Sequence, residues 1–487
     1  MRNYRKHFAF LMSFLLMASA VSCGSGGSET QIPQETLPAD TAPAEMETEL
    51  RAELPDKTYN GEEVMFLTSL NKGYDWYTSY EIYAAEMNGQ LINDAVFTRN
   101  QQIEELLDIR IAETKMENAH NIAQETLIAG DDQFDVVMPY INNTISLATQ
   151  GLLMDLNTIP YLDLEKPWWD QRANENMIIA DKLFFSTGDI AILDNECTMV
   201  MFFNKDMIEQ YSLENPYELV KEHKWTIDKV GEMASVVTHD LNGDGKMTGD
   251  DTWGLSIAGN APISFYFGTG ERIVDRNDEG KLEFQIGSVR SYDVFDKVMT
   301  LCYDEMMLSD KTASAGFDVV SVMFNAGQVM FVTFALVDIN ALREAEFEFG
   351  ILPYPLFDET QQEYNNLISS GLVSSTSVPY NNKNTELTGV TLEAMAYYST
   401  STLTPAYYDN ALKTRYVRDE ESGEMLDIIF ATRVYDLGFI FDWGGAGSLV
   451  TSIYNAKSTE YVSKWQAIQQ KAQSALDEAL ETFAALQ

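Results

Sequence analysis

Short apolar runs alternate with longer segments of helical spacing along most of the chain. Residues 63–68 form an apolar run that predicts a strand, and apolar side chains recur every three or four residues over 91–107, which predicts a helix. The alternation continues with predicted strands at 109–112 and 134–138 and a predicted helix at 118–128. Strands that alternate with helices of this length indicate parallel βαβ units and therefore an α/β fold.

The same pattern extends through the second half of the sequence. Thr226 is placed to cap a helix over 227–237, and residues 458–486 form a long helical pattern without Gly or Pro. Runs that are apolar throughout indicate strands buried on both faces of a sheet. These further strands are predicted at 183–186, 199–203, 329–333 and 347–352.

The first 23 residues have the features of an export signal. A positively charged start precedes an apolar run over 8–21, which is too short to span a membrane comfortably and typical of a signal peptide. The run ends in Ala20-Val21-Ser22-Cys23, which resembles the bacterial lipobox. The resemblance implies that residues 1–22 are removed and that Cys23 carries a lipid, with ordinary secretion as the alternative.

Residues 23–56 read as a tether. The stretch 24–55 contains four prolines, seven acidic residues and one Arg, with almost no aromatic or β-branched side chains. Such a composition cannot bury enough apolar surface to order itself. We therefore expect a flexible acidic tether, with the folded part starting near Lys57.

Charge excludes one class of partner. The 487 residues include 32 Lys+Arg and 75 Asp+Glu, a formal net charge of −43. This balance repels nucleic-acid phosphates, so we expect no nucleic-acid partner. Of the three cysteines, Cys197 and Cys302 remain once Cys23 is assigned to the lipid, and their spacing leaves a disulfide between them open.

Motifs for covalent chemistry are missing from the sequence. There is no HExxH, no Cys/His cluster, no GxSxG and no GxxxxGK[ST]. Ser69 and Lys72 match SxxK without the motifs that accompany it in enzymes, and the glycines at 444–447 lack the third Gly of a dinucleotide fingerprint. We therefore expect that the protein is not an enzyme and binds no organic cofactor.

Several segments together resemble a known family. They are residues 130–139, 147–157, 181–185 followed by 201–205, the Trp225-Thr226 helix start, and 324–331. Their order and spacing resemble the extracellular solute-binding proteins of family 1, the substrate-capturing lipoproteins of ABC importers.

The resemblance implies a fold and a function. It implies two α/β lobes joined by a hinge, each with a mostly parallel sheet, and a sugar or oligosaccharide in the cleft between them. We place lobe one at 57–190 and 328–380 and lobe two at 191–327 and 381–487. The expected partners are the permease subunits and, through Cys23, the outer face of the cell membrane, with the protein itself a monomer. The alternatives are a lipid-tethered secreted glycoside hydrolase and a surface adhesion module.

Candidate ligand contacts follow from the strand ends and the resemblance. A sugar needs an aromatic wall and polar side chains that bind its hydroxyl groups. Each aromatic candidate has core packing as its alternative, and Trp168 and Trp169 fit either a cleft rim or the core. The predicted contacts are Trp76, Tyr140, Asn142 and Asp189 in lobe one and Asn260, Asp442 and Trp443 in lobe two.

The segment 240–251 matches the spacing of an EF-hand loop. Such a loop places oxygen ligands at positions 1, 3, 5, 7, 9 and 12 and a Gly at position 6, here Gly245. A solvated acidic turn is the alternative, and Asp stands where a bidentate Glu is usual. The predicted structural Ca²⁺ ligands are Asp240, Asn242, Asp244, Lys246 through its carbonyl, Thr248 and Asp251.

Overall fold

The structure is a computed structural model that describes residues 51–257, 259–304, 307–309, 316–408 and 419–486. The expected signal peptide (1–22), the lipidation site Cys23 and the tether as far as residue 50 lie outside the described residues. Among the described residues, no helix combines the length and the apolar character that a membrane-spanning helix needs.

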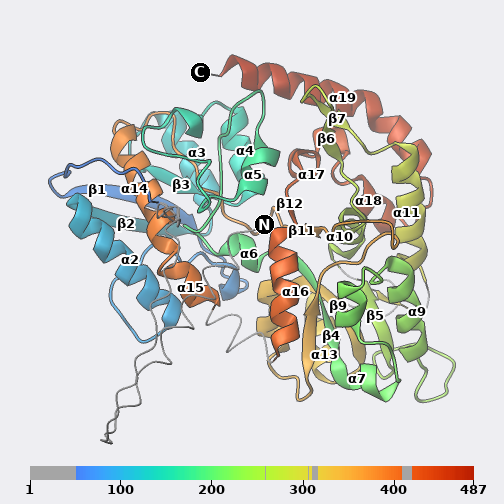
Figure 1. The fold of residues 1–487 in the computed structure, drawn as a ribbon. Helices are drawn as coiled ribbons and strands as arrows, with labels where there is room; N and C mark the ends of the chain where they lie inside the picture. Colours follow the sequence, from blue (N-terminus) through green and yellow to red (C-terminus); the bar gives the residue numbers. More distant parts are fainter. Residues whose placement is uncertain (1–50, 258, 305–306, 310–315, 409–418, 487) are drawn as a thin grey trace, which may run out of the picture. The chain divides into compact units, whose positions relative to one another are not determined.

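The first sheet has three parallel strands in the order β2-β1-β3 (Figure 1). They are β1 (Glu62–Ser69), β2 (Ile109–Met116) and β3 (Val136–Met138). All three residues of β3 are buried, as are Val64 and Phe66 of β1. The apolar runs at 63–68 and 134–138 therefore form strands as predicted, and their carboxyl ends lie at the same edge of the sheet.

Helices that follow these strands cover this sheet. Helix α2 (Leu91–Leu107) ends at Asp108, which adopts a left-handed conformation, and α3 (Ala119–Ala129) ends at Gly130 with φ of 77°. This first sheet and the helices around it are called the first half below. Its other helices are α4 (Ile141–Thr149), α5 (Gln171–Met177), α14 (Thr385–Ser399) and α15 (Leu403–Tyr407).

The second sheet has five strands in the order β10-β4-β9-β5-β8. The central strand β9 (Val329–Ala335) is buried along its whole length, runs antiparallel to β4 and runs parallel to β5. The sheet is therefore mixed rather than mostly parallel. The other strands are β4 (Met199–Asn204), β5 (Trp253–Ile257), β8 (Leu308–Ser309) and β10 (Phe349–Leu352).

Many helices and a short hairpin accompany the second sheet, and together they form the second half (Figure 1). Thr226 caps α9 (Ile227–Val237) as predicted, because its side chain accepts a hydrogen bond from the backbone N–H of Lys229. The remaining elements are α7 (Lys205–Gln210), α8 (Pro216–Lys221), α10 (Ala261–Gly268), β6 (Val274–Arg276), β7 (Leu282–Phe284), α11 (Val289–Cys302), α13 (Phe317–Asn325), α16 (Glu420–Ala431), α17 (Leu437–Phe441), α18 (Leu449–Asn455) and α19 (Tyr461–Ala485).

Two expected lobe assignments differ from the structure. Residues 328–380 were expected in lobe one. Strands β9 and β10 instead pair with β4 of the second sheet, whereas residues 374–379 form bridges with the first half as expected. Residues 381–487 were expected in lobe two, but α14 packs on α2 and β1 of the first half. Apolar patterning predicts that a strand is buried and does not identify the strand with which it pairs.

Short segments connect the two halves. Residues 186–199 contain α6 (Leu193–Glu196), and β11 (Asn366–Leu367) pairs with β12 (Arg433–Val434). The predicted strand at 183–186 is not formed, because this segment pairs only through a single bridge between Ser186 and Thr376. Cys197 and Cys302 are both buried and free, so they form no disulfide with each other.

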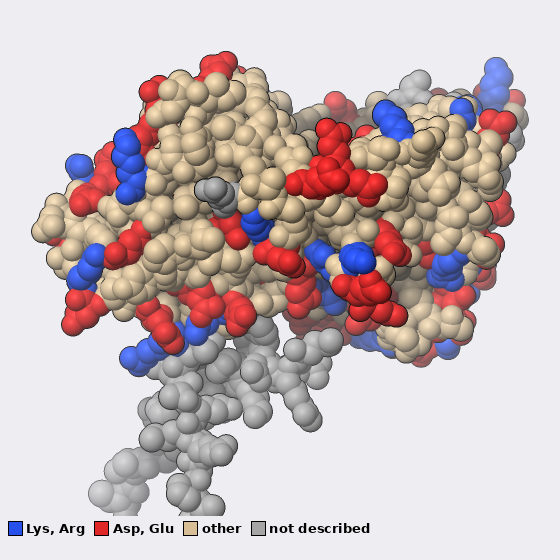
Figure 2. Space-filling model, turned by 90° about the horizontal axis from the view of Figure 1, so that it is seen from above, with Lys and Arg blue, Asp and Glu red and all other residues tan. Residues whose placement is uncertain are grey.

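The surface carries the acidic excess of the sequence. Figure 2 shows acidic side chains across the face seen there, with basic side chains between them. The described ion pairs are mostly exposed ones, such as Lys72–Glu117 and Lys281–Glu279, which contribute little to stability. The excess of carboxylates therefore mainly keeps the protein soluble and repels negatively charged partners.

Candidate ligand-binding site

Aromatic and acidic residues follow the carboxyl ends of three strands from both halves. The turn η1 (Asp75–Tyr77) follows β1, and Tyr140 comes two residues after β3. The turn η3 (Leu336–Leu342) directly follows β9 and carries Asp338 in its first turn. Ligands of open α/β sheets bind at such carboxyl ends, so these turns form the candidate site.

Asp338 joins the two halves at this site. Its Oδ1 accepts hydrogen bonds from the indole Nε1 of Trp76 at 3.4 Å and from the hydroxyl of Tyr77. Its Oδ2 accepts from the backbone N–H of Ala335 at 3.0 Å. Burial raises the pKa of Asp338 to about 6, and these hydrogen bonds to the carboxylate oppose the rise.

A second contact between the halves lies beside Asp338. The hydroxyl of Tyr74 donates to Oδ1 of Asp318 at 3.1 Å, and its ring lies edge-on to Phe317, with centroids 5.5 Å apart. The ring of Tyr74 also lies 5.2 Å from that of Trp76. Aromatic rings beside a carboxylate suit a ligand that has both an apolar face and hydroxyl groups.

Tyr140 belongs to the same group. Its hydroxyl donates to the backbone carbonyl of Tyr77 at 3.2 Å, and burial raises its pKa. Asn142 lies in the first turn of α4 with an exposed side chain, and its backbone N–H donates to the carbonyl of Ser370. The structure thus brings Trp76 and Tyr140 together through Tyr77, with Asn142 two residues further along the chain.

Asp189 lies in the connection between the halves, within a buried charged group. Burial raises its pKa to about 7, the Asp194 carboxylate adds to the rise, and the Arg433 guanidinium opposes it. Arg433 itself donates to Asp170 at 2.6 Å and to Asp194 at 3.3 Å. Asp189 therefore lies beside a buried salt-bridge network in the connection between the two halves.

The three predicted residues of lobe two lie elsewhere. Asn260 is exposed at the start of α10, and Asp442 uses its carboxylate to accept hydrogen bonds from the backbone N–H and the hydroxyl of Ser448. Trp443 is 5% exposed and stacks on Phe441 with centroids 4.7 Å apart. The ring surface on which a ligand was expected to stack is therefore covered in this structure.

Asp338 is the site residue that the sequence reasoning missed. It stands three residues after a strand that is apolar throughout, which is the same signal that pointed to Trp76 and Tyr140 after their strands. The expected contacts follow other strand ends, so Asp338 is not among them, although the strand before it was predicted at 329–333. Phe317 and Asp318 carry no such signal, since they approach Tyr74 only through the tertiary fold.

The predicted calcium loop connects α9 and β5 and is mostly exposed, although Asp251 is buried. Its acidic side chains bind the loop's own backbone: Asp240 accepts from the N–H groups of Gly243 and Gly245, and Asp251 accepts from those of Leu241 and Thr248. The bond from Thr248 lowers the pKa of Asp251. Over the part of the chain that the structure describes, no three His, Cys, Asp or Glu side chains form a metal-holding group, and calcium binding stays a prediction.

Solved structures with the same fold cover most of the chain. An ABC substrate-binding protein of Listeria monocytogenes in complex with cycloalternan aligns over 87% of this chain and 99% of its own, with 14% identity and a TM-score of 0.53. A cyclo/maltodextrin-binding protein complexed with maltotetraose aligns over 87% and 97%, with 12% identity and a TM-score of 0.54. A family 1 extracellular solute-binding protein of Bifidobacterium longum subsp. infantis aligns over 88% and 100%, with 15% identity and a TM-score of 0.52.

Sequence comparison identifies the family. No curated protein matches the chain significantly. The family model for bacterial extracellular solute-binding proteins matches residues 117–401, which is more than half of the chain. These residues include β3 and Tyr140, the connection with Asp189, and β9 with Asp338. The chain therefore belongs to the bacterial extracellular solute-binding proteins.

Proposed function

We propose that the protein captures a sugar or oligosaccharide outside the cell and delivers it to an ABC permease. The carrying observation is that turns from the carboxyl ends of β1 and β9 meet at Asp338, with Trp76, Tyr77 and Tyr74 around it. Proteins of the same fold bind cycloalternan and maltotetraose, which supports a carbohydrate ligand. The family and these relatives are binding proteins, in keeping with a role without covalent chemistry.

The chemistry of the site favours a neutral ligand. An indole N–H, tyrosine hydroxyls and a carboxylate supply both hydrogen-bond donors and acceptors, as sugar hydroxyl groups require. The aromatic rings supply a surface for the apolar face of a pyranose. Asp318 and Asp338 would repel an anion, so an anionic ligand fits the site poorly.

Thermal-shift screening against a sugar panel, followed by calorimetry on the hits, tests this proposal. A ligand at 100 times its Kd stabilises the protein by about 2.7 kcal/mol. Trp76→Ala should weaken binding by about 2 kcal/mol, or about thirtyfold in Kd, because the ligand loses an apolar wall. The matched control is Tyr380→Ala, which removes an exposed ring of the first half. Equal affinities for Trp76→Ala and the wild type would contradict the assignment of the site.

The proposal includes a lipid anchor. Lipid on Cys23 and an acidic tether from there to about residue 50 would hold the binding domain near the outer face of the membrane, since Ala52 and Leu54 already pack against the core. The lipobox-like sequence at 20–23 and the Pro-rich composition of the tether support this. Metabolic labelling with palmitate should mark the wild type and leave Cys23→Ser unlabelled.

We expect the protein to work as a monomer that alternates between an open and a closed form. Binding between the halves would stabilise a closed form, and the permease would recognise that form. The contacts of Tyr74 with Asp318 and of Trp76 with Asp338 support a closed arrangement in which strand-end turns of the two halves meet.

A structural calcium ion in the loop at 240–251 completes the proposal. Its support is the spacing of Asp240, Asn242 and Asp244 around the turn at Gly245, whose φ is 77°. The ion would stiffen the connection between α9 and β5 without contacting the ligand.

A further inference from the structure

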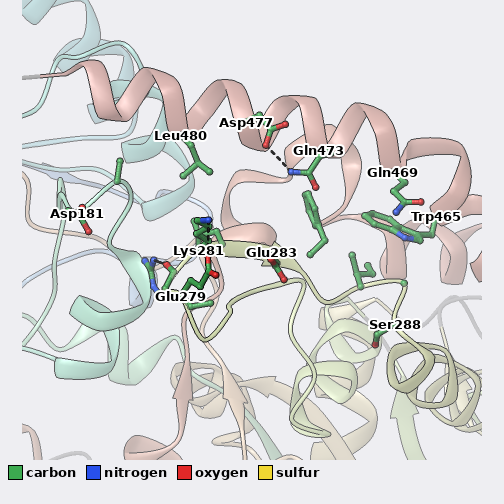
Figure 3. Close-up of a pocket in the computed structure, with 17 residues that line it drawn as sticks. Asp181, Glu279, Lys281, Glu283, Ser288, Trp465, Gln469, Gln473, Asp477 and Leu480 are labelled. Carbon is green, nitrogen blue, oxygen red and sulfur yellow. Dashed lines mark hydrogen bonds and ion pairs between the residues drawn. The ribbon is translucent and has the colours of Figure 1, made fainter.

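A cavity of about 850 Å³ lies apart from the candidate site, beneath the long helix α19. Figure 3 shows α19 above it, with Trp465, Gln469, Gln473 and Asp477 on the side of the helix that faces the cavity, and the β6–β7 hairpin below with Lys281 and Glu283. A turn of the first half, with Ala180 and Asp181, forms a further wall. The volume lies within the range of small-molecule sites.

The apolar wall of this cavity contains an unused hydrogen-bond donor. Trp465 is 4% exposed, and its ring lies 5.4 Å from that of Phe284. A Cβ on Gly287 would lie 2.0 Å from the indole nitrogen, so glycine at this position lets the indole lie against the backbone. The indole N–H has no hydrogen-bond partner among the residues that the structure describes.

The turn that carries Asp181, across the cavity from Trp465, has an unfavourable backbone conformation. Ala180 and Asp181 have φ of 50° and 61°, and a bridge between Ile179 and Lys182 closes the turn around them. Two residues with positive φ define a type I′ turn, for which Asn-Gly is preferred over Ala-Asp. Left-handed conformations of such residues cost about 1 kcal/mol or more each and often mark functional positions.

The cations of the lining already donate hydrogen bonds, whereas one carboxylate, one indole N–H and one amide remain available. Arg276 donates to the carbonyls of Gly280 and Ile178, and Lys281 pairs with Glu279. The amide of Gln469 has no hydrogen-bond partner in the described part of the chain. The carboxylate of Asp181 accepts no hydrogen bond there either, although it lies close enough to the Arg276 guanidinium to interact with its charge. The open groups are therefore the carboxylate of Asp181 as acceptor, the indole N–H of Trp465 as donor, and the amide of Gln469 as both.

We propose that this cavity is a second saccharide site, separate from the site at Asp338. Hydroxyl groups donate to carboxylates and accept from N–H groups, so a polyol satisfies the open groups of both kinds at once. The carboxylates of Asp181, Glu283 and Asp477 disfavour an anion. A simple cation would leave the indole N–H and the amide of Gln469 without acceptors, and the rings of Phe284 and Trp465 suit the apolar face of a sugar.

Indole resonances of the ¹⁵N-labelled protein test this proposal. The chain has seven tryptophans, and Trp465→Phe assigns the signal of Trp465. Maltotriose, raffinose and cellotriose are titrated to about 10 mM, with spermidine as the cationic comparison. At least one trisaccharide should shift the Trp465 signal, and Gln469→Ala and Asp181→Asn should weaken that response about three- to tenfold, the worth of about one hydrogen bond. Gln466→Ala, an exposed position of α19 outside the cavity, should leave it unchanged.

The signal of Trp76 separates this site from the one at Asp338. A shift of Trp465 that Gln469→Ala weakens, with the response of Trp76 unaltered, supports an independent second site. The proposal is overturned if no trisaccharide shifts Trp465, if only spermidine does, or if the shift is the same in Gln469→Ala and Asp181→Asn as in the wild type. Each of these results leaves the proposed capture of a sugar at Asp338 untouched.

Discussion

Glu393 explains why two neighbouring tryptophans are buried. The indole N–H groups of Trp168 and Trp169 each donate to one carboxylate oxygen of Glu393 at 3.0 Å, and the backbone N–H of Asp163 adds a third bond. Burial raises the pKa of Glu393, which these hydrogen bonds oppose. Trp168 and Trp169 are each 2% exposed. The sequence left open whether they line the rim of a cleft or pack in the core, and the structure places both in the core.

We predict that Glu393→Ala destabilises the protein by about 2–6 kcal/mol. The change leaves two buried indole N–H groups without acceptors, and each unsatisfied donor costs about 1–3 kcal/mol. Urea unfolding followed by tryptophan fluorescence measures the loss. Glu165→Ala removes an exposed carboxylate nearby and should shift the free energy of unfolding by less than about 0.5 kcal/mol. A loss for Glu393→Ala as small as that of Glu165→Ala would show that the two indoles do not depend on Glu393.

The expectation that ligand contacts follow strand ends selected residues that the structure brings together, and their contact with a ligand stays a prediction. It identified Trp76 and Tyr140, which share the group around Tyr77. It did not include Asp338, although this residue lies in the first turn of η3, directly after β9. Trp443 was expected in the cleft from the resemblance, and only its packing against Phe441 and beneath α19 shows that its ring is covered.

At the scale of the element, the sequence pattern predicted where helices and strands lie along the chain, but not which strands pair with one another. Helix α2 has the predicted bounds, and α9 and α19 differ from theirs by a few residues at most, because spacing and caps are local signals. The strand at 329–333 was also predicted, yet it pairs with β4 and β5 from much earlier in the chain. A strand that is apolar on both faces has no alternating pattern that would fix its pairing register. Its neighbouring strands are therefore determined by the fold as a whole.

The loop at 240–251 is the element with the clearest test. We predict that calcium raises the Tm of the wild type and that Asp240→Ala combined with Asp244→Ala abolishes the increase, because both carboxylates are ligands in an EF-hand-type loop. Differential scanning calorimetry with and without millimolar calcium measures the shift. Asp206→Ala combined with Glu209→Ala removes the same charge from exposed positions of α7 and should keep the full increase. Isothermal calorimetry that detects no binding at millimolar calcium would refute the site.

At the scale of the whole molecule, the contacts at Asp318 and Asp338 predict a change of size on binding. Small-angle scattering should give a smaller radius of gyration with the sugar than without it, because the ligand adds bonds between the halves that already meet there. Asp338→Asn should reduce the compaction at a given sugar concentration. A tight ligand that leaves the radius of gyration unchanged would rule out closure.

Several buried carboxyls give the molecule an unusual dependence on pH. Burial raises the pKa of Asp189 to about 7 and those of Asp194, Asp338 and Asp436 to about 6, against values near 4 in the unfolded chain. Between pH 5.5 and 7.5 the folded state therefore binds more protons than the unfolded state, and stability falls as pH rises. Each carboxyl with a pKa near 6 contributes about 1 kcal/mol over this window.

We predict that the Tm rises by several degrees when the pH is lowered from 7.5 to 5.5. The relief of repulsion in a chain of net charge −43 acts in the same direction. Scanning calorimetry across this range, in buffers of equal ionic strength, measures the slope. Asp338→Asn cannot ionise and should show a shallower slope, while a Tm that falls with acidification over this window would contradict the raised pKa values.

The two buried cysteines can report how often the folded protein opens. An extracellular protein meets oxidants that convert exposed thiols to disulfides, yet Cys197 and Cys302 are enclosed by the core. Burial raises the pKa of both thiols, so almost no reactive thiolate is present in the folded state. Only an opening of the core can expose them. The speed at which an alkylating reagent modifies these two side chains therefore reports how often the molecule opens, in the absence of denaturant and without an added label.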